Sequence, residues 1–284
     1  MARSAPSTYA APPSANTRTR RAPAGPIMPR MSGYLAACAI FRNEARYLAE
    51  WVAFHRIVGV EHLFLYNNLS DDGYAEVLEP FVAEGSVTLI DWPAYPGQNQ
   101  AYDDCLERAR GAWRWVAFID LDEFLFSPRI RPVPELLTQF EHLPGVGVPW
   151  AQFGTSGHTT PPPGLVIENY TKRRVGRRNL RQFKSLVDPA AVRRCLGPHS
   201  FQYADPRYGG PVPRFAFSHD LRVNHYFSRS EAEFQAKITA LDSYGEHRNA
   251  KVFIATNRAA TALDQTITAY GPAVRDALTR AGRP

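Results

Sequence analysis

The amino-acid sequence predicts an α/β fold in which a mostly parallel central sheet carries helices on both faces. Between residues 34 and 119, four apolar segments of strand length alternate with three segments of helical periodicity. Short turns join these segments, and such alternation is typical of a parallel sheet. Polar residues gather where several of the predicted strands end, which is where sheets of this kind bind their ligands.

The first strand and the first helix are predicted over residues 34–41 and 45–58. The strand is a continuous apolar run, as expected of a strand that is buried on both faces. Gly59 is expected to end the helix. At helical spacing, one face of this helix carries Leu48, Trp51, Val52 and His55.

The alternation continues to residue 119 and weakens after residue 126. Strands are predicted over residues 62–66, 86–90 and 113–119, with helices over residues 71–84 and 98–111. Further on, the sequence predicts a helix over 134–140, extended segments over 146–153 and 221–227, and a helix over 230–241. Ser230 and Glu233 form the capping box that opens the last helix.

The composition indicates one domain between two segments of different character. The chain is 44% hydrophobic and 21% charged, which is ordinary for a globular protein. Residues 1–31 form a segment rich in arginine and proline that is predicted to be disordered. The domain is expected over residues 32–262, and residues 263–284 are weakly patterned and expected to fray.

Charge and cysteine content exclude several classes of protein. The net charge of +6 resides mostly in the N-terminal segment, so the basic balance does not indicate a nucleic-acid partner. No segment approaches the ~20 apolar residues of a transmembrane helix. The three cysteines form no CxxC pair, so neither a disulfide framework nor a zinc site is indicated. A reducing, cytoplasmic setting is therefore expected.

The main indication of chemistry is a pair of carboxylates, Asp120 and Asp122, at the end of the predicted strand 113–119. In an extended chain their side chains point the same way, because side chains repeat with period 2. Two adjacent carboxylates repel each other unless a cation lies beside them. Mg²⁺ or Mn²⁺ suits oxygen ligands and commonly bridges to substrate phosphates. The pair therefore predicts a metal site for a nucleotide diphosphate.

His225 lies within the predicted strand 221–227, among apolar residues. Two interpretations of this histidine are open at this stage. It is either a hydrogen-bonded residue of the core or a third metal ligand that acts as a neutral imidazole.

A third group of polar residues is expected to bind the nucleotide. Asparagine and aspartate at strand ends can hydrogen-bond to a base or a ribose, although capping and turn formation explain them equally well. The predicted donor-binding residues are Arg42, Asn43, Glu44, Asn67, Asn68, Gln100, Asp104 and Asp120. Because no Gly-rich phosphate-binding motif is present, we exclude kinases and nicotinamide dehydrogenases.

One basic stretch lies inside the predicted domain. We expect most of its side chains to face solvent and one or two to contact an anionic ligand. Its members are Lys172, Arg173, Arg174, Arg177, Arg178, Arg181 and Lys184.

The ordered set of motifs between residues 34 and 240 resembles glycosyltransferase family 92, formerly a domain of unknown function numbered 23, and bacterial glycosyltransferase family 2-like relatives. The matching segments are residues 37–44, 47–52 with His55, 66–72, Gln100 with Asp104 and Cys105, 120–124, 153–158, 184–187 and 224–227. Each motif is short, and their order along the chain makes the resemblance specific.

The resemblance implies a GT-A type fold and a hexosyltransferase that uses a nucleotide-sugar, UDP-linked ahead of GDP-linked, with inversion at the anomeric carbon. It implies a Mn²⁺ or Mg²⁺ ion at the Asp120 and Asp122 motif. A glycan or glycolipid is the expected acceptor, and the sequence does not specify which. By this resemblance Asp120, Asp122 and His225 are residues of the metal site.

The base that deprotonates the acceptor is not apparent from the sequence. Asp220 and His158 are the two candidates, and Asp188 is a third option. Two other functions stay open: a nucleotidyltransferase of a related α/β fold, and a non-catalytic carbohydrate-binding protein.

Overall fold

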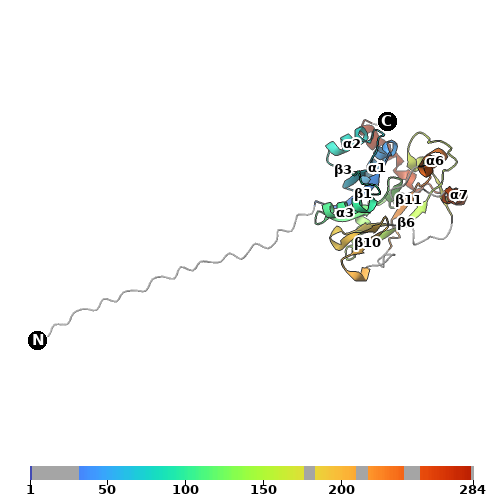
Figure 1. The fold of residues 1–284 in the computed structure, drawn as a ribbon. Helices are drawn as coiled ribbons and strands as arrows, with labels where there is room; N and C mark the ends of the chain where they lie inside the picture. Colours follow the sequence, from blue (N-terminus) through green and yellow to red (C-terminus); the bar gives the residue numbers. More distant parts are fainter. Residues whose placement is uncertain (2–31, 176–182, 209–216, 240–249, 283–284) are drawn as a thin grey trace.

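The computed structural model describes residues 1, 32–175, 183–208, 217–239 and 250–282 (Figure 1), so the predicted N-terminal tail lies outside the described residues apart from Met1. The strands are β1 (Gly33–Phe41), β2 (His62–Asn67), β3 (Val87–Asp91), β4 (Trp113–Phe118), β5 (Glu123–Phe126), β6 (Gly145–Gln152), β7 (Lys172–Arg174), β8 (Phe183–Val187), β9 (Val192–Gly197), β10 (Ser200–Tyr203), β11 (Arg222–His225) and β12 (Ala260–Leu263). The α-helices are α1 (Ala45–Ile57), α2 (Tyr74–Ala83), α3 (Gln98–Ala109), α4 (Val133–Leu137), α5 (Val166–Asn169), α6 (Glu231–Thr239), α7 (Ala250–Ala259) and α8 (Gly271–Arg280). Short 3-10 turns are η1 (Thr138–Phe140), η2 (Pro189–Ala191), η3 (Pro206–Tyr208) and η4 (Thr266–Tyr270).

The main sheet has eight strands in the order β3-β2-β1-β4-β8-β6-β11-β5. The four strands β1 to β4 are parallel to one another, and β6 and β11 point the same way as these four. Only β8 and β5 run in the opposite direction within this sheet. The predicted α/β class with a mostly parallel sheet is confirmed.

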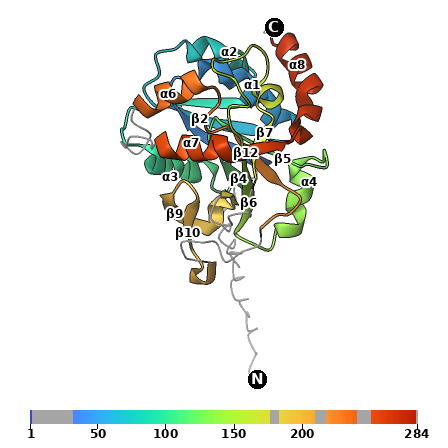
Figure 2. The ribbon, with the colours of Figure 1, turned by 90° about the vertical axis from the view of Figure 1, so that its right-hand side faces the viewer.

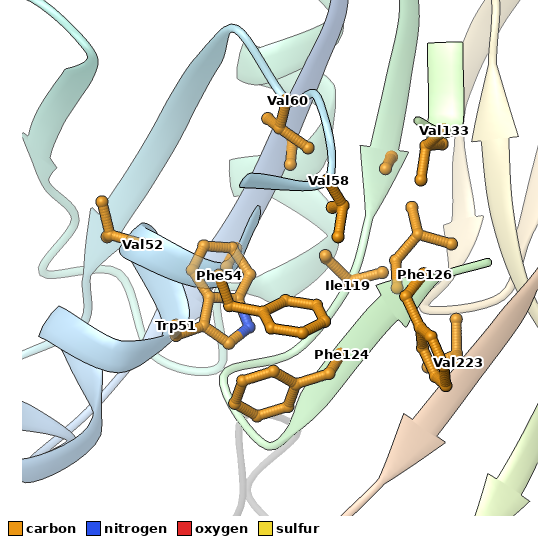
Figure 3. Close-up of a cluster of buried hydrophobic side chains, with 14 of the residues drawn as sticks. Trp51, Val52, Phe54, Val58, Val60, Ile119, Phe124, Phe126, Val133 and Val223 are labelled. Atoms are coloured by element: carbon orange, nitrogen blue, oxygen red, sulfur yellow. The ribbon is translucent and has the colours of Figure 1, made fainter. Parts of the chain in front are cut away.

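Apolar residues of alternating register place helices on both faces of the sheet. Leu35, Ala37 and Ala39 of β1 belong to the cluster around α1, whereas Ala36 and Cys38 belong to the cluster around α3 and the β9–β10 hairpin. Successive side chains of a strand point to opposite faces, so one buried strand feeds both cores. Figure 3 shows the first cluster, in which Trp51 and Phe54 of α1 lie beside Phe124 of β5.

The sheet curls, because consecutive strands β4 and β5 occupy distant positions in its order. Four strand spacings separate them, which in a flat sheet is about 19 Å. The chain from Phe118 to Glu123 reaches at most about 18 Å when fully extended. It is not extended, since the Glu123 amide donates to the Asp120 carbonyl at 3.0 Å. The sheet must therefore curve around α1 until β5 lies over that helix.

The three cysteines are free and buried, as the sequence predicts. Among the described helices, none combines the length and the apolar character needed to cross a membrane. The cytoplasmic setting stays a prediction.

The C-terminal segment differs from the expectation that it would fray. Residues 266–280 form η4 and α8, and α8 packs against α1 (Figure 2). Ile267 and Val274 are buried, and the Tyr270 hydroxyl donates to the Ser127 carbonyl at 3.1 Å. The domain therefore continues past the predicted boundary at residue 262, because these apolar contacts complete the core around α1.

Two residues of this segment provide a matched test of its contribution to stability. Ile267 is 1% exposed and Leu263 is 66% exposed. We expect Ile267→Ala to lower the free energy of unfolding by about 2–5 kcal/mol, as truncation of a buried aliphatic side chain does. Leu263→Ala should change it by less than about 0.5 kcal/mol. Urea unfolding of both variants measures the difference, and equal midpoints would show that the segment is not part of the core.

Glu50 of α1 holds the start of α5. Its carboxylate accepts the amide of Val166 at 2.8 Å and the amide of Ile167 at 3.1 Å. Burial raises the pKa of Glu50 from 4.5 to about 7, and the two amides only partly offset that rise. Between these pH values the folded chain holds a proton that the unfolded chain has released. The free energy of unfolding therefore falls as the pH rises through this window.

We expect Glu50→Gln to remove this pH dependence, because the amide oxygen still accepts a hydrogen bond and cannot ionise. Between pH 5 and pH 8, the free energy of unfolding of the variant should fall less than that of the parent, by up to about 3 kcal/mol. Urea unfolding at both pH values is the measurement, with the exposed Glu79→Gln as the control. An unchanged slope in Glu50→Gln would contradict the assignment.

Candidate active site

The acidic turn, residues 120–123, connects β4 to β5 and contains both predicted aspartates. The indole Nε1 of Trp51 donates to the Asp120 carbonyl at 3.1 Å and to the Glu123 carbonyl at 2.9 Å. The Glu123 carboxylate in turn accepts the Asp120 amide at 3.1 Å. Helix α1 therefore fixes both ends of the turn through its backbone, and the side chains of Asp120 and Asp122 remain available for other contacts.

His55, one helical turn after Trp51, ties α1 to β5. Its Nδ1 donates to the Trp51 carbonyl at 2.8 Å, and its Nε2 accepts the Leu125 amide at 3.2 Å. Burial lowers the pKa of His55 to about 3, so the ring is neutral and acts as one donor and one acceptor. Trp51 and His55, on the face predicted for this helix, thus fix the backbone of the acidic turn and of β5.

Lys184 of β8 supplies the first counter-charge of the turn. Its side chain is 0% exposed, and its Nζ lies 2.7 Å from Asp120 Oδ2 and 3.2 Å from Glu123 Oε2. Burial by itself would lower the pKa of Lys184, but the two carboxylates outweigh it and raise the pKa to about 12. The lysine is therefore a permanent buried cation.

The two carboxylates that share Lys184 differ in charge. Lys184 lowers the pKa of Asp120 below its usual range against the opposing effect of burial. Asp120 also accepts from Gln98 Nε2 at 3.2 Å and from the Tyr102 hydroxyl at 3.3 Å. Burial raises the pKa of Glu123 to about 7, since Lys184 offsets only part of it. Asp120 is the ionised partner, and Glu123 takes up a proton more readily than an exposed glutamate does.

Asp122 faces a different set of groups. Its Oδ2 lies 2.8 Å from Nζ of Lys237 on α6, and its Oδ1 lies 3.5 Å from Nε2 of His225. Burial opposes ionisation, but Lys237 and His225 hold the pKa of Asp122 well below its usual range. His225 reaches this position because it is the last residue of β11 and pairs in register with Glu123. Its ring packs on Trp150, with ring centroids 4.5 Å apart.

Arg229 closes the site from the side of α6. It is 3% exposed and its guanidinium donates to Glu44 at 2.6 Å and to the Leu121 carbonyl at 3.2 Å. The same group lies 3.7 Å from the centre of the Tyr47 ring. Its backbone has φ 47°, which is unfavourable for a non-glycine residue and recurs at functional sites. Arg229 thus joins the start of α1 to the middle of the acidic turn.

The predicted donor-binding residues at the ends of β1 and β2 lie together at one edge of the sheet. Arg42 is exposed and lies 5.8 Å from the centre of the Tyr95 ring. Asn43 Oδ1 accepts the Asp71 amide, while the side-chain amides of Asn67 and Asn68 donate to Asp91 and to the Trp92 carbonyl at the end of β3. These asparagines hold the turns of this edge, so turn formation accounts for their bonds and Arg42 is the exposed cation among them.

The structure separates Gln100 and Asp104 from the acidic turn. Gln100 is exposed on α3, and Asp104 accepts from the Tyr66 hydroxyl at 2.7 Å and from Arg108. Gln98 faces Asp120 instead. Two positions along a helix rotate a side chain by about 200°, so Gln98 and Gln100 point in different directions.

The structure does not bring the predicted bases to the carboxylates. Asp220 precedes β11 at the end opposite His225, where it pairs with Arg129 at 3.1 Å. Asp188 follows β8 at that same edge of the sheet, caps η2 and pairs with Arg114 at 3.1 Å. His158 lies on a loop at the α6 side, and its Nε2 is 3.1 Å from the Asn169 carbonyl. All three have structural partners at their observed positions.

The basic stretch divides into separate roles. Arg173 pairs with Asp264 at 2.8 Å, and Lys184 is buried with the acidic turn rather than exposed to solvent. Arg177, Arg178 and Arg181 lie outside the described residues.

Only part of the predicted metal-ligand set converges. Asp122 and His225 face each other, whereas Asp120 turns to Lys184, Gln98 and Tyr102. In the described part of the chain, no group of three or more His, Cys, Asp or Glu side chains is arranged to hold a metal ion. A carboxylate oxygen and an imidazole nitrogen 3.5 Å apart do suit two adjacent ligands of one Mn²⁺ or Mg²⁺ ion that takes its remaining ligands from water and phosphate.

The sequence of the chain matches the family model of glycosyltransferase family 92 over residues 34–249. The chain belongs to glycosyltransferase family 92. Membership confirms the resemblance of the motifs and, together with the observed sheet, the predicted GT-A type of α/β fold.

Three relatives illustrate the range of family 92 similarity. A glycosyltransferase family 92 protein of Oryza sativa subsp. japonica is 35% identical over 59% of this chain and 29% of its own length. One of Ricinus communis is 32% identical over 72% of this chain and 36% of its own length. A beta-1,4-galactosyltransferase of Caenorhabditis elegans is 28% identical over 38% of this chain and 27% of its own length. The chain thus spans about a third of the length of the curated relatives it matches.

Sequence reasoning missed four contacts of this family 92 site, those made by Gln98, Lys184, Arg229 and Lys237. For Lys184 a signal exists, because a single lysine inside the apolar strand β8 requires a buried acidic partner. For Lys237 and Arg229 the local pattern gives no such signal. Lys237 lies on an ordinary capped helix, Arg229 precedes that helix, and both make their contacts across the fold.

We expect Lys184→Met to destabilise this family 92 chain strongly, because Asp120 and Glu123 lose their shared cation. Removing one partner of a buried ion pair typically lowers the free energy of unfolding by about 3–5 kcal/mol. The exposed Lys172→Met makes the same chemical change and should shift it by less than about 0.5 kcal/mol. Urea unfolding followed by tryptophan fluorescence compares them. Equal midpoints would mean that Lys184 does not stabilise the acidic turn.

Proposed function

We propose that the chain is a glycosyltransferase that moves a sugar from a nucleotide-diphospho-sugar, UDP-linked ahead of GDP-linked, to a hydroxyl of a glycan or glycolipid. The observation that carries the proposal is the pairing of Asp122 with His225 beside the acidic turn, at the carboxyl ends of the strands of a family 92 domain. The galactosyltransferase name of one relative supports a hexose as the transferred group.

The proposed site offers positive charge to the donor diphosphate in two ways, through a metal ion and through an arginine. Asp122 and His225 would hold a divalent cation, Mn²⁺ or Mg²⁺, which supplies positive charge to the departing diphosphate. The ionised state of Asp122 fits this role, since its pKa lies well below its usual range. Exposed Arg42, at the end of β1, offers a second cation for phosphate at the same edge of the sheet.

Asp120 has a different role in this proposal. Lys184, Gln98 and Tyr102 hold its carboxylate in one orientation, and a third of the side chain remains exposed. A fixed, ionised and accessible carboxylate suits hydrogen bonds from the hydroxyls of the donor ribose or sugar. The reaction inverts the anomeric carbon in this proposal, so a base must take the proton of the acceptor hydroxyl as it attacks.

A thermal-shift titration tests the proposal. Nucleoside diphosphates, nucleoside triphosphates, nucleotide-sugars and free glycans are added to the parent chain and to Asp122→Asn, each with and without Mn²⁺. A ligand at 100 times its Kd should stabilise the parent by about 2.7 kcal/mol. We expect a shift with a UDP-linked ligand that requires Mn²⁺ and that Asp122→Asn abolishes, because the carboxylate is the anionic ligand of the ion.

Other outcomes would contradict the proposal in distinct ways. A shift with nucleoside triphosphates alone would indicate a nucleotidyltransferase. Stabilisation by free glycans without any nucleotide response would indicate a carbohydrate-binding protein. A UDP-linked response that is equal with and without Mn²⁺ would retain the transferase and overturn its metal dependence.

A further inference from the structure

Lysines are rare in this chain, and half of them pair with the two aspartates of the acidic turn. The four lysines are Lys172, Lys184, Lys237 and Lys251. Lys184 contacts Asp120, and Lys237 contacts Asp122. Each aspartate therefore has its own ammonium group, supplied by a different element of the fold.

The two pairs differ in how firmly the lysine is held. Lys184 is 0% exposed and lies between two carboxylates. If its ammonium group moved away, both carboxylates would be left in the core without a counter-charge. The side chain of Lys237 is 18% exposed, and its Nζ has one carboxylate at 2.8 Å and the Phe227 carbonyl at 3.4 Å. Lys237 also projects from the last turn of α6 on a four-carbon stem that can swing.

The ammonium group of Lys237 lies next to the Asp122–His225 pair, where the proposed divalent cation would bind. Its Nζ binds Asp122 Oδ2, while His225 faces Asp122 Oδ1. An ammonium group and a divalent ion on one small carboxylate repel each other strongly. When a divalent ion binds Asp122, Lys237 is therefore expected to leave, and the nearest anion for it would be the diphosphate of the donor.

We propose that Lys237 is an exchangeable counter-ion: it neutralises Asp122 while no donor is bound, yields to the divalent ion, and then binds the donor diphosphate. This inference rests on the proposed function, because it assumes a metal and a diphosphate at Asp122. It makes Lys237 a competitor of the metal in one state and a ligand of the nucleotide in the other.

Mn²⁺ and UDP titrations of the full chain test the exchange. Without nucleotide, Lys237→Met should bind Mn²⁺ about fivefold more tightly than the parent, as expected when one partly exposed competing cation is removed. With saturating Mn²⁺, the same variant should bind UDP about tenfold more weakly, because a charge-assisted hydrogen bond is lost. The electron paramagnetic resonance signal of free Mn²⁺ reports the first affinity, and calorimetry reports the second.

Matched variants separate the exchange from a general loss of charge or of folding. Lys237→Arg keeps the charge and should stay within about twofold of the parent for Mn²⁺. Lys172→Met removes an exposed lysine that has no contact with the acidic turn and should match the parent in both titrations. Urea midpoints establish that each variant is folded, and Lys237→Gln is the alternative if Lys237→Met is not.

Unchanged or weaker Mn²⁺ binding in Lys237→Met and Lys237→Gln would overturn the exchange, and so would unchanged UDP binding. Failure of the proposed function looks different. In that case the parent itself would show no Mn²⁺-dependent UDP binding, and Asp122→Asn would bind Mn²⁺ as the parent does.

Discussion

The structure depends on a constraint of charge: three carboxylates, those of Asp120, Asp122 and Glu123, lie within four residues of a largely buried turn. Such a turn is stable only if other parts of the chain supply positively charged side chains, because poorly solvated carboxylates repel each other and lose hydration. The chain meets this need from distant segments, with Lys184 on β8 and Lys237 on α6. The second half of the sequence is thus required to complete a site that the first half begins.

The backbone of the turn is fixed separately from its charges. Trp51 and His55 bind main-chain groups of the turn and of β5, so α1 sets the position of the turn whatever the ionisation of its side chains. Helix α8 covers α1 from outside, and Tyr270 reaches the end of β5 through the Ser127 carbonyl. Packing of α8 therefore supports the acidic turn indirectly, because α8 holds α1 and α1 holds the turn.

The sequence was informative where local periodicity determines structure. Strands and helices up to residue 119 were predictable because each carries its pattern over its own length, an apolar run in a strand and helical spacing in a helix. Asp120 and Asp122 stood out as carboxylates at a strand end, and His225 as a histidine within an apolar strand. The pattern could not reveal the curl that brings β5 over α1, nor α8, whose apolar residues acquire meaning only against α1. It also placed Gln100 rather than Gln98 at the site, because a helical face is fixed by what the helix packs on.

The two aspartates of the motif look equivalent in the sequence, and their surroundings make them different. A spacing of two residues aims both side chains the same way, but the partners then divide them. Asp120 is held by a buried lysine that also pairs with Glu123, and the departure of this lysine would leave both side chains without a cation. The Asp120 carboxylate is therefore a fixed feature of the site. Asp122 has a partly exposed lysine on one oxygen and a histidine near the other, so its counter-charge can be exchanged. A motif of two like charges can thus contain one permanent and one replaceable ion pair, and burial of the lysine decides which is which.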